Sequence, residues 1–268
     1  MRVMRCLAGL LFLWAAACGV PEAAAQKLVT VQSRTGVSVP IFVADTGSRR
    51  AEAVVLLFPG GGGYIKLREE GGQPKFDGGN FLVRSRVDFI RANLQPIIVD
   101  APSDQRSGDG MSDAFRASAA HLADARAVIA EARRRFPGLP VYLVGTSRGT
   151  ISVAYLAGAL GSEIQGAVLT SSLFGGGRPP VLGAFDWKSI SAPVLFVHHR
   201  DDACRQTPYA EAARLADRYP LISVKGGKPP ESGPCDPFAA HGFFGVEAQT
   251  VQAIANWIFG RAFVKEVG

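Results

Sequence analysis

Cysteine, histidine and long apolar runs are all scarce in this chain of 268 residues. Its four cysteines form no C-x-x-C pair and none stands beside a histidine, so the ligand spacing of a zinc site is missing and we expect no metal. No apolar stretch is long enough for a transmembrane helix. Glycine (31) and proline (17) are too few for a collagenous or disordered chain. The composition is that of a globular protein.

The net charge of +6 raises the question of a nucleic-acid partner. The basic residues are scattered, however, and the densest run, Arg133–Arg135, ends a helical pattern, where cations suit the helix dipole. No basic stripe carries interleaved aromatic residues. We therefore expect no nucleic-acid partner.

The first 25 residues have the pattern of a signal peptide. Arg2 and Arg5 precede an apolar run that is too short to span a bilayer, and an A-x-A cleavage signal stands directly before Gln26. A second interpretation is a lipid anchor at Cys18, although Ala15 occupies the position where such a signal has a leucine-like residue. We predict that residues 1–25 are removed and that residues 26–268 form one exported domain, periplasmic or secreted.

Removal of that leader leaves two cysteines, Cys204 and Cys235. An exported chain enters an oxidising compartment, where an even pair of cysteines predicts a disulfide. Two unrelated buried thiols are the alternative.

Short strand-like runs alternate with helical patterns after Gln26. This alternation predicts an α/β fold with a mostly parallel sheet of about eight strands and helices on both faces. Two long irregular stretches, 60–79 and 226–242, are expected to be functional, since long loops in compact domains usually are. The predicted strands are 28–34, 37–45, 53–58, 96–101, 141–144, 166–170, 193–199 and 221–225, and the predicted helices are 81–93, a long one from Ser112, 151–160, 208–219 and 246–259.

The sequence Gly145-Thr146-Ser147-Arg148-Gly149 is a G-x-S-x-G motif between a predicted strand and a predicted helix. A serine on such a sharp turn needs small neighbours, because its backbone is strained and other chain segments pass close by. The setting predicts a nucleophilic serine at 147. An ordinary glycine-rich turn is the alternative.

A serine hydroxyl needs a base, and the chain has only four histidines. His121 falls on the polar side of a predicted helix, where we expect it to be solvated. His198 and His199 end a strand, where we expect packing or support of a neighbouring loop. His241 lies in the long loop after the last strand, which favours it as the base.

The acid that orients the histidine is expected between the serine and the histidine in the chain. Asp201 and Asp202 directly follow the strand 193–199, and either could serve. Asp186, before that strand, and Asp236, in the proline-rich loop, are weaker candidates.

A run of four glycines, 60–63, follows the strand 53–58. Glycine lets a backbone approach a substrate oxygen, so Gly61 and Gly62 are candidate oxyanion-hole donors, together with the N–H of Arg148 after the serine. A phosphate-binding loop is the alternative, but the run lacks the Lys-Ser/Thr pair that such loops carry.

With these motifs in the order Ser, Asp, His, the chain resembles the α/β-hydrolase-fold serine hydrolases over residues 28–259. In that family the acid precedes a small residue or proline, which favours Asp202, followed by Ala203. The segment 176–188, where a lid often stands, is short, so no large lid is expected. The size is similar to dienelactone-hydrolase-like proteins, but those usually carry cysteine as nucleophile. Pro59 also departs from the histidine of many lipases.

This resemblance implies an exported, cofactor-independent serine hydrolase, most simply a carboxylic-ester hydrolase with a small-molecule ester substrate. A peptidase or acyltransferase on the same residues is the alternative, as is a hydrolase-fold protein that binds a ligand without turnover. Arg84, Arg86 and Arg205 are interpreted as solvated rather than as a site for acidic substrates. In this fold the loops after the seventh and eighth strands meet, so a Cys204–Cys235 bridge would tie the acid loop to the histidine loop.

Overall fold

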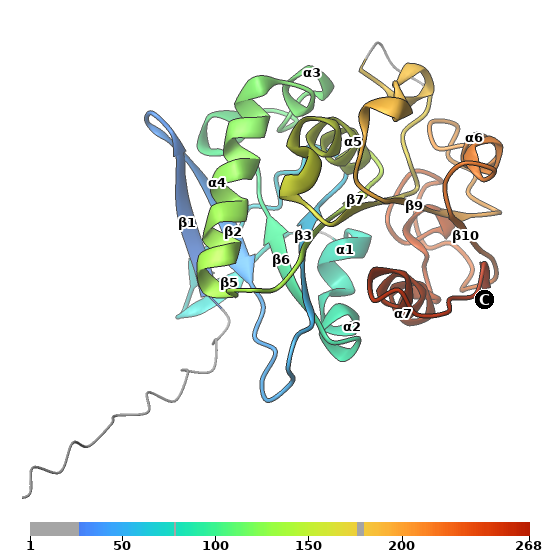
Figure 1. Ribbon diagram of the computed structural model, residues 1–268, viewed down its shortest axis with the longest axis horizontal. Helices are drawn as coiled ribbons and strands as arrows, with labels where there is room; N and C mark the ends of the chain where they lie inside the picture. The colour runs from blue at the N-terminus through green and yellow to red at the C-terminus, as the bar shows by residue number, and fades with distance from the viewer. Residues whose placement is uncertain (1–26, 78, 176–179) are drawn as a thin grey trace, which may run out of the picture.

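The computed structural model describes residues 27–77, 79–175 and 180–268. The predicted leader and Cys18 lie outside the described residues. A nine-stranded sheet, in the order β1-β2-β6-β3-β7-β8-β9-β10-β11, runs through the molecule (Figure 1). This is one strand more than the sequence predicts, because β11 (Glu266–Val267) pairs with β10 (Leu221–Val224). Two residues are too few to show any periodicity.

The hairpin of β1 (Lys27–Arg34) and β2 (Val37–Val43) forms the antiparallel edge of the sheet. All the other strands are parallel, and β3 lies between β6 and β7, where the order of the strands reverses. Ligand sites in open parallel sheets lie at the carboxyl ends of the strands near such a point. The remaining strands are β3 (Ala53–Phe58), β6 (Leu94–Val99), β7 (Val141–Thr146), β8 (Gly166–Thr170) and β9 (Val194–His199).

Helices cover both faces of the sheet, as Figure 1 shows. α4 (Ala119–Arg135), α5 (Gly149–Leu160) and α6 (Tyr209–Leu215) pack on one face. α1 (Phe81–Arg84), α2 (Arg86–Arg91) and α7 (Glu247–Ile258) pack on the other. Since both faces are covered, strands such as β3 are buried along their whole length, which explains their continuous apolar sequence.

Two predicted helices are each broken in the structure. The predicted helix 81–93 is α1 and α2, with a break at the buried Ser85. The helix predicted to run on from Ser112 ends as α3 (Asp113–Arg116), and α4 begins anew after Ser118. Ser118 is itself an N-cap, since its hydroxyl accepts a hydrogen bond from the N–H of His121. Ser112 is the N-cap of α3 and Ser118 is the N-cap of α4. The second cap therefore starts a new helix within two turns of the first.

The two long loops differ in how irregular they are. Residues 60–79 include a small hairpin of β4 (Arg68–Glu70) and β5 (Gln73–Lys75), which the sequence analysis missed. Residues 226–242 contain only the 3-10 turn η5 (Ala240–Gly242). Among the described residues between β8 and β9 there are two 3-10 turns, η3 (Leu182–Ala184) and η4 (Trp187–Ser189), and no lid domain. Within the described ranges, no helix combines the length and the apolar character needed to cross a membrane.

Candidate active site

The predicted site residues all follow the carboxyl ends of parallel strands. Gly60 and its glycine neighbours follow β3, Ser147 follows β7, Asp202 follows β9 and His241 lies in the loop after β10. The fold thus gathers at one edge of the sheet residues that are up to 181 positions apart, from Gly60 to His241.

Ser147 occupies a tight turn between β7 and α5. Its φ is 53°, in the left-handed region that non-glycine residues rarely adopt, and its N–H donates to the carbonyl of Thr170 at 3.0 Å. A Cβ on Gly145 would come within 2.6 Å of the carbonyl oxygen of Gly149, and one on Gly149 within 2.1 Å of that of Phe58. The turn therefore requires glycine at both flanking positions.

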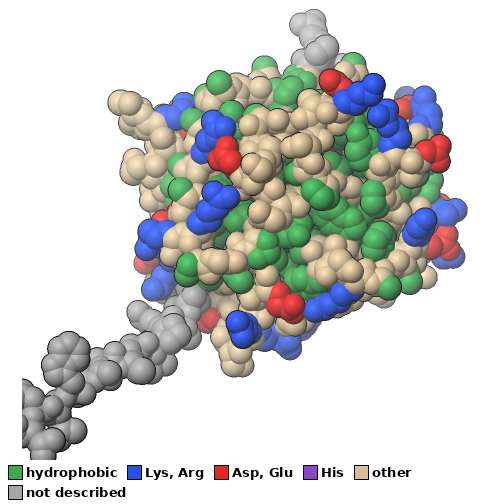
Figure 2. All heavy atoms as spheres, in the orientation of Figure 1, with side chains coloured by type: hydrophobic (Ala, Val, Ile, Leu, Met, Phe, Trp, Pro, Cys, Tyr) green, Lys and Arg blue, Asp and Glu red, His purple; other side chains and the backbone are tan. Residues whose placement is uncertain are grey.

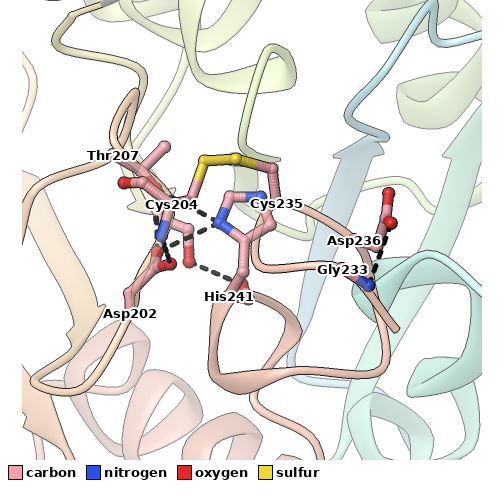
Figure 3. The surroundings of a disulfide bond; sticks show 8 residues. Asp202, Cys204, Thr207, Gly233, Cys235, Asp236 and His241 are labelled. Carbon is pink, nitrogen blue, oxygen red and sulfur yellow. Dashed lines mark hydrogen bonds and ion pairs between the residues drawn. A yellow bond between two sulfur atoms is a disulfide. The ribbon is translucent and has the colours of Figure 1, made fainter. Parts of the chain in front are cut away.

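His241 is hydrogen-bonded to Asp202, with 3.0 Å between His241 Nδ1 and Asp202 Oδ2 (Figure 3). The Asp202 side chain is 0% exposed and accepts two further hydrogen bonds, from the N–H of Cys204 and the hydroxyl of Thr207. Asp201 points away from this cluster, with its side chain 76% exposed. Of the two neighbouring carboxylates, only Asp202 is held against the imidazole.

Cys204 and Cys235 form a disulfide with a Cα–Cα distance of 4.7 Å, within the normal range. The bridge joins the acid loop to the histidine loop directly beside the His241 ring, as Figure 3 shows. It links the two segments that carry Asp202 and His241.

Two other side chains hold the histidine loop by its backbone. The hydroxyl of Ser171, at the end of β8, donates to the carbonyl of His241 at 2.8 Å. Arg84, on α1, donates to the carbonyls of Gly242 and Gly79 and pairs with Glu247 at 3.0 Å. Arg84 is thus half-buried and structural, and its interpretation as a solvated side chain is wrong.

A pocket of about 310 Å³ opens at this edge of the sheet, and both Ser147 and His241 line it. No hydrogen bond joins Ser147 Oγ to His241 among the described residues. Gly61 and Gly62 also line the pocket. Arg148 is not among the lining residues and follows Ser147 directly in the chain. The other lining residues are Pro59, Gly60, Gly63, Tyr64, Ile65, Asp77, Gly79, Asn80, Phe81, Thr146, Cys235, Asp236, Pro237 and Gly242.

The glycine run lies against the serine turn. A Cβ on Gly60 would come within 2.9 Å of Ser147 Cβ, and one on Gly62 within 1.7 Å of the carbonyl oxygen of Asp109. Neither position has room for a side chain. The run is therefore packed between the serine and the segment 107–112.

The remaining histidines have structural positions. His121 is 3% exposed, packed between the rings of Phe58 and Phe115, so its prediction as solvated is wrong. It stands four positions before the buried Ala125 on the inner face of α4, and burial lowers its pKa to about 3. His199 supports the acid loop as predicted, since its Nδ1 accepts from the N–H of Asp201 at 3.1 Å.

His198 is also buried and lies closer to the site. Its Nε2 accepts a hydrogen bond from the N–H of Ser172 at 2.8 Å, and burial lowers its pKa to about 3. It therefore stays neutral and holds the chain just after β8.

The weaker acid candidates lie apart from His241. Asp186 caps η4 by accepting from the N–H of Lys188, and Asp236 accepts from the N–H of Gly233. Of the other arginines considered, Arg86 donates to the carbonyl of Val83 and Arg205 is exposed. None of Arg84, Arg86 and Arg205 lines the pocket.

Within the described ranges, no group of three or more His, Cys, Asp or Glu side chains could hold a metal ion. On the face shown in Figure 2, basic side chains are spread around the edge and several stand beside acidic ones. Among the described residues, Arg34 pairs with Asp104 and Asp124. The positive charge is thus partly neutralised locally.

The comparisons with known proteins agree with this architecture. Residues 104–228 match the family model described as serine aminopeptidase S33, a stretch that includes Ser147 and Asp202 and ends before His241. No curated protein matches the sequence significantly. Many solved structures are similar.

Three of these structures show the extent of the likeness. The lidless α/β serine hydrolase XC6422 from Xanthomonas campestris has 14% identity and a TM-score of 0.57 over 85% of this chain and 94% of its own. Est1E from Butyrivibrio proteoclasticus has 13% identity and a TM-score of 0.57 over 87% and 98%. A cold-adapted esterase from an Arctic intertidal metagenomic library has 16% identity and a TM-score of 0.52 over 80% and 90%. The fold is that of the α/β hydrolases, and with the family match the chain is a serine hydrolase of this fold.

Sequence reasoning missed four residues that hold the site: Arg84, Arg116, Ser171 and Thr207. Thr207 stands five positions after Asp202, and a hydroxyl so close to a candidate acid was a usable signal. Arg84 and Arg116 lie on helices far from any motif, and their contacts depend on how the loops fold over them. No sequence pattern marks these two.

Proposed function

We propose that this serine hydrolase is an exported carboxylic-ester hydrolase in which Ser147, His241 and Asp202 form the catalytic triad. The observation that carries the proposal is the hydrogen bond between His241 and the buried Asp202, at a pocket that Ser147 also lines. An imidazole oriented by a buried carboxylate next to a serine on a strained turn is the arrangement that acyl transfer needs.

In the proposed reaction, Ser147 Oγ attacks the acyl carbon of the ester while His241 Nε2 takes the hydroxyl proton. Asp202 keeps the other ring nitrogen of His241 protonated and stabilises the imidazolium that forms. The backbone N–H groups of Gly61, Gly62 and Arg148 donate to the oxyanion. His241 then returns the proton to the leaving alcohol, and water hydrolyses the acyl-enzyme by the same steps.

The pocket supports a small and uncharged acyl group. Its volume of about 310 Å³ is at the lower end for ligand sites. Its polar lining includes Asp77 and Asp236, and no Lys or Arg is among the described residues that line it. A substrate with a carboxylate near the ester would meet no cation there.

A fluorophosphonate probe tests the proposal directly, because it labels only an activated serine. We expect it to label the wild type at Ser147 and to leave Ser147→Ala unlabelled, with ester hydrolysis lost in parallel. A protein that binds esters without labelling or turnover would be a binding module and would contradict the proposal.

Peptidase activity is the second candidate, because the family model matched over 104–228 is described as a serine aminopeptidase. A panel of p-nitrophenyl esters, aminoacyl amides and lactones separates the two. The proposal expects kcat/KM for short-chain esters to exceed that for amides by at least 100-fold. A preference for aminoacyl amides would make the protein a peptidase on the same residues.

Export is part of the proposal and is supported by the leader pattern of residues 1–25 and by the disulfide. Expression of the full chain in a bacterium, followed by fractionation and N-terminal sequencing, tests it. We expect a product that begins at Gln26 outside the cytoplasm. A product blocked at Cys18 would indicate the lipid anchor, and a full-length cytoplasmic product would contradict export.

A further inference from the structure

A buried arginine, Arg116, lies behind the glycine run. It ends α3 and is 1% exposed, and no carboxylate of the described residues forms an ion pair with it. Its guanidinium donates to the carbonyl of Gly61 at 2.9 Å and to the hydroxyl of Ser152 at 2.9 Å. Burial lowers its pKa to about 9, so the group is still cationic at neutral pH. Burying a cation whose hydrogen-bond partners are both neutral costs free energy, so we expect Arg116 to have a role that offsets this cost.

The glycine run forms a tight turn whose central peptide can face either way. The N–H of Gly63 donates to the carbonyl of Gly60 at 3.0 Å, which closes a four-residue turn. Gly61 has a φ of 57°, whereas Gly62 is not among the residues with positive φ, and this is the type II′ pattern. A half rotation of the peptide between Gly61 and Gly62 would give type I′, which glycine adopts as readily. Glycine alone therefore does not choose between them.

The orientation of that peptide decides whether the turn offers a donor or an acceptor. In a trans peptide, the C=O of one residue and the N–H of the next point in opposite directions. Arg116 binds the Gly61 carbonyl and does not line the pocket, so the Gly62 N–H points away from Arg116, towards the pocket that both glycines line. In the rotated turn, the Gly61 oxygen would face the pocket and would repel an oxyanion.

We propose that Arg116 is a positioning residue for the oxyanion hole, which holds the central peptide of the Gly60–Gly63 turn with its N–H towards the substrate. The proposal rests on the esterase function proposed above. The positive charge behind the peptide also polarises it, which makes the Gly62 N–H a stronger donor in the transition state.

The second contact of Arg116 supports the same role. Ser152 lies in the first turn of α5, which begins at Gly149 directly after Arg148. One guanidinium is thus bonded both to the glycine turn and to the helix that follows the nucleophile. These two segments carry the two sets of proposed oxyanion donors, Gly61 and Gly62 on one and Arg148 on the other. Arg116 fixes the spacing between them, and sites of this kind tolerate errors of only about 0.5 Å.

The test compares Arg116→Met with Arg116→Lys and with the control Arg106→Met. Arg106 also donates to a backbone carbonyl, but that carbonyl belongs to Ala101 and not to the glycine run. For each variant we would measure kcat and KM for the best p-nitrophenyl ester, per site titrated with a fluorophosphonate, and the Ki of a trifluoromethyl ketone. That ketone forms a hemiketal oxyanion with the serine and so reports on the hole itself.

We expect Arg116→Met to lower kcat per titrated site about 10- to 100-fold with KM within twofold of the wild type, and to raise the Ki of the ketone by a similar factor. Arg116→Lys keeps the positive charge but lacks the two separate NH2 groups of the guanidinium. Its loss of kcat should be smaller than that of Arg116→Met, again with kcat and Ki changing together. Arg106→Met should change neither. If Arg116→Met does not fold, Arg116→Lys decides by the same criterion.

An unchanged kcat and Ki per titrated site in a folded Arg116 variant would overturn the inference and leave a purely structural role. A fall in kcat without any rise in Ki would overturn it too. These results are distinct from failure of the proposed function, which would appear as Ser147→Ala retaining the activity of the wild type.

Discussion

Two irregular segments face each other across the pocket and are held in different ways. The first, residues 60–67, carries the proposed oxyanion donors and has no covalent link to the rest of the site. Its backbone is bound by buried polar groups: Arg116 donates to Gly61, and the carboxylate of Asp100 accepts from the N–H groups of Ile65 and Leu67 at 2.7 and 2.9 Å. The second, residues 226–242, carries His241 and is held by a disulfide, by Ser171 and by Arg84.

Neither segment is therefore positioned by its own secondary structure. Each depends on side chains from other elements that bind its backbone groups, and only the histidine segment has a link that a reductant can break. The two segments should therefore respond differently to the same treatment.

The largest effect is expected at Asp202, which is hydrogen-bonded to His241 of the second segment. Asp202→Asn should lower kcat by about 10²–10⁴, because the amide leaves His241 with the wrong tautomer and without a counter-charge. Asp201→Asn is the matched control, since its side chain is 76% exposed, and it should lower kcat less than threefold. Steady-state ester hydrolysis checks both variants. If the two effects were reversed, the acid would be Asp201.

Reduction of the Cys204–Cys235 bridge comes next. The bridge spans 31 positions and so contributes roughly 3–4 kcal/mol in the chain-entropy model. We expect the double variant Cys204→Ser/Cys235→Ser to lose about 10-fold in kcat while its circular dichroism at 25 °C stays native, because the histidine segment loosens before the core does. The same loss should appear when the wild type is reduced. Activity and unfolding falling together over a reductant titration would argue against this order.

A smaller effect is expected from Arg84→Met. Arg84 binds the carbonyls of Gly242 and Gly79, which both line the pocket, and its loss should lower kcat about three- to tenfold and leave Glu247 unpaired. Arg86→Met is the control, since Arg86 donates to the carbonyl of Val83 and lies over the Phe76 ring but forms no hydrogen bond with Gly79 or Gly242. Kinetics combined with urea unfolding at pH 7 would separate the two. Equal kcat values for both variants would show that the Gly242 contact has no role in catalysis.

The smallest effect concerns stability alone and lies outside both segments. Burial lowers the pKa of His121 to about 3, below the value near 6.5 of an unfolded histidine. The unfolded chain therefore binds a proton that the folded chain does not, and stability falls as the pH falls from about 6.5 towards 3. At pH 5 this group alone accounts for about 2 kcal/mol. His121→Leu should remove that loss without changing kcat at pH 7.

Urea unfolding of the wild type and His121→Leu at pH 7 and pH 5 checks this prediction. Part of the acid sensitivity should remain in the variant, because burial also lowers the pKa of His198 to about 3. An identical pH dependence of the two proteins would mean that His121 is protonated in the folded state.

The sequence predicted the framework of the fold well because buried parallel strands and the residues after them leave clear local patterns. Ser147, Asp202 and His241 could be proposed since each follows such a strand, and the cysteine pair since only two cysteines follow the predicted leader. His121 was assigned to the wrong environment, although it stands four positions before the buried Ala125 and so lies on the same face of α4. A histidine within a helical pattern carries no local signal that separates a buried ring from a solvated one.

The supports of the site were less predictable than the site itself. Arg116 and Arg84 look in sequence like ordinary helix cations, and their roles appear only when loops from other parts of the chain fold over them. The glycine run 60–63 indicated that another group must approach its backbone closely. It could not show which way its central peptide faces.

The backbone at Ser147 has a consequence for how far this protein can be stabilised. Ser147, Ser171 and Phe243 all have positive φ, at 53°, 46° and 59°, and all three lie at the site. A non-glycine residue in this region costs about 1–2 kcal/mol. Three such residues give up a sizeable share of the 5–15 kcal/mol that keeps a typical domain folded. Glycine at 147 would relax the backbone but remove the nucleophile, and glycine at 243 would remove a buried ring that packs against Phe81. Selection for thermal tolerance alone at position 147 would therefore favour an inactive protein.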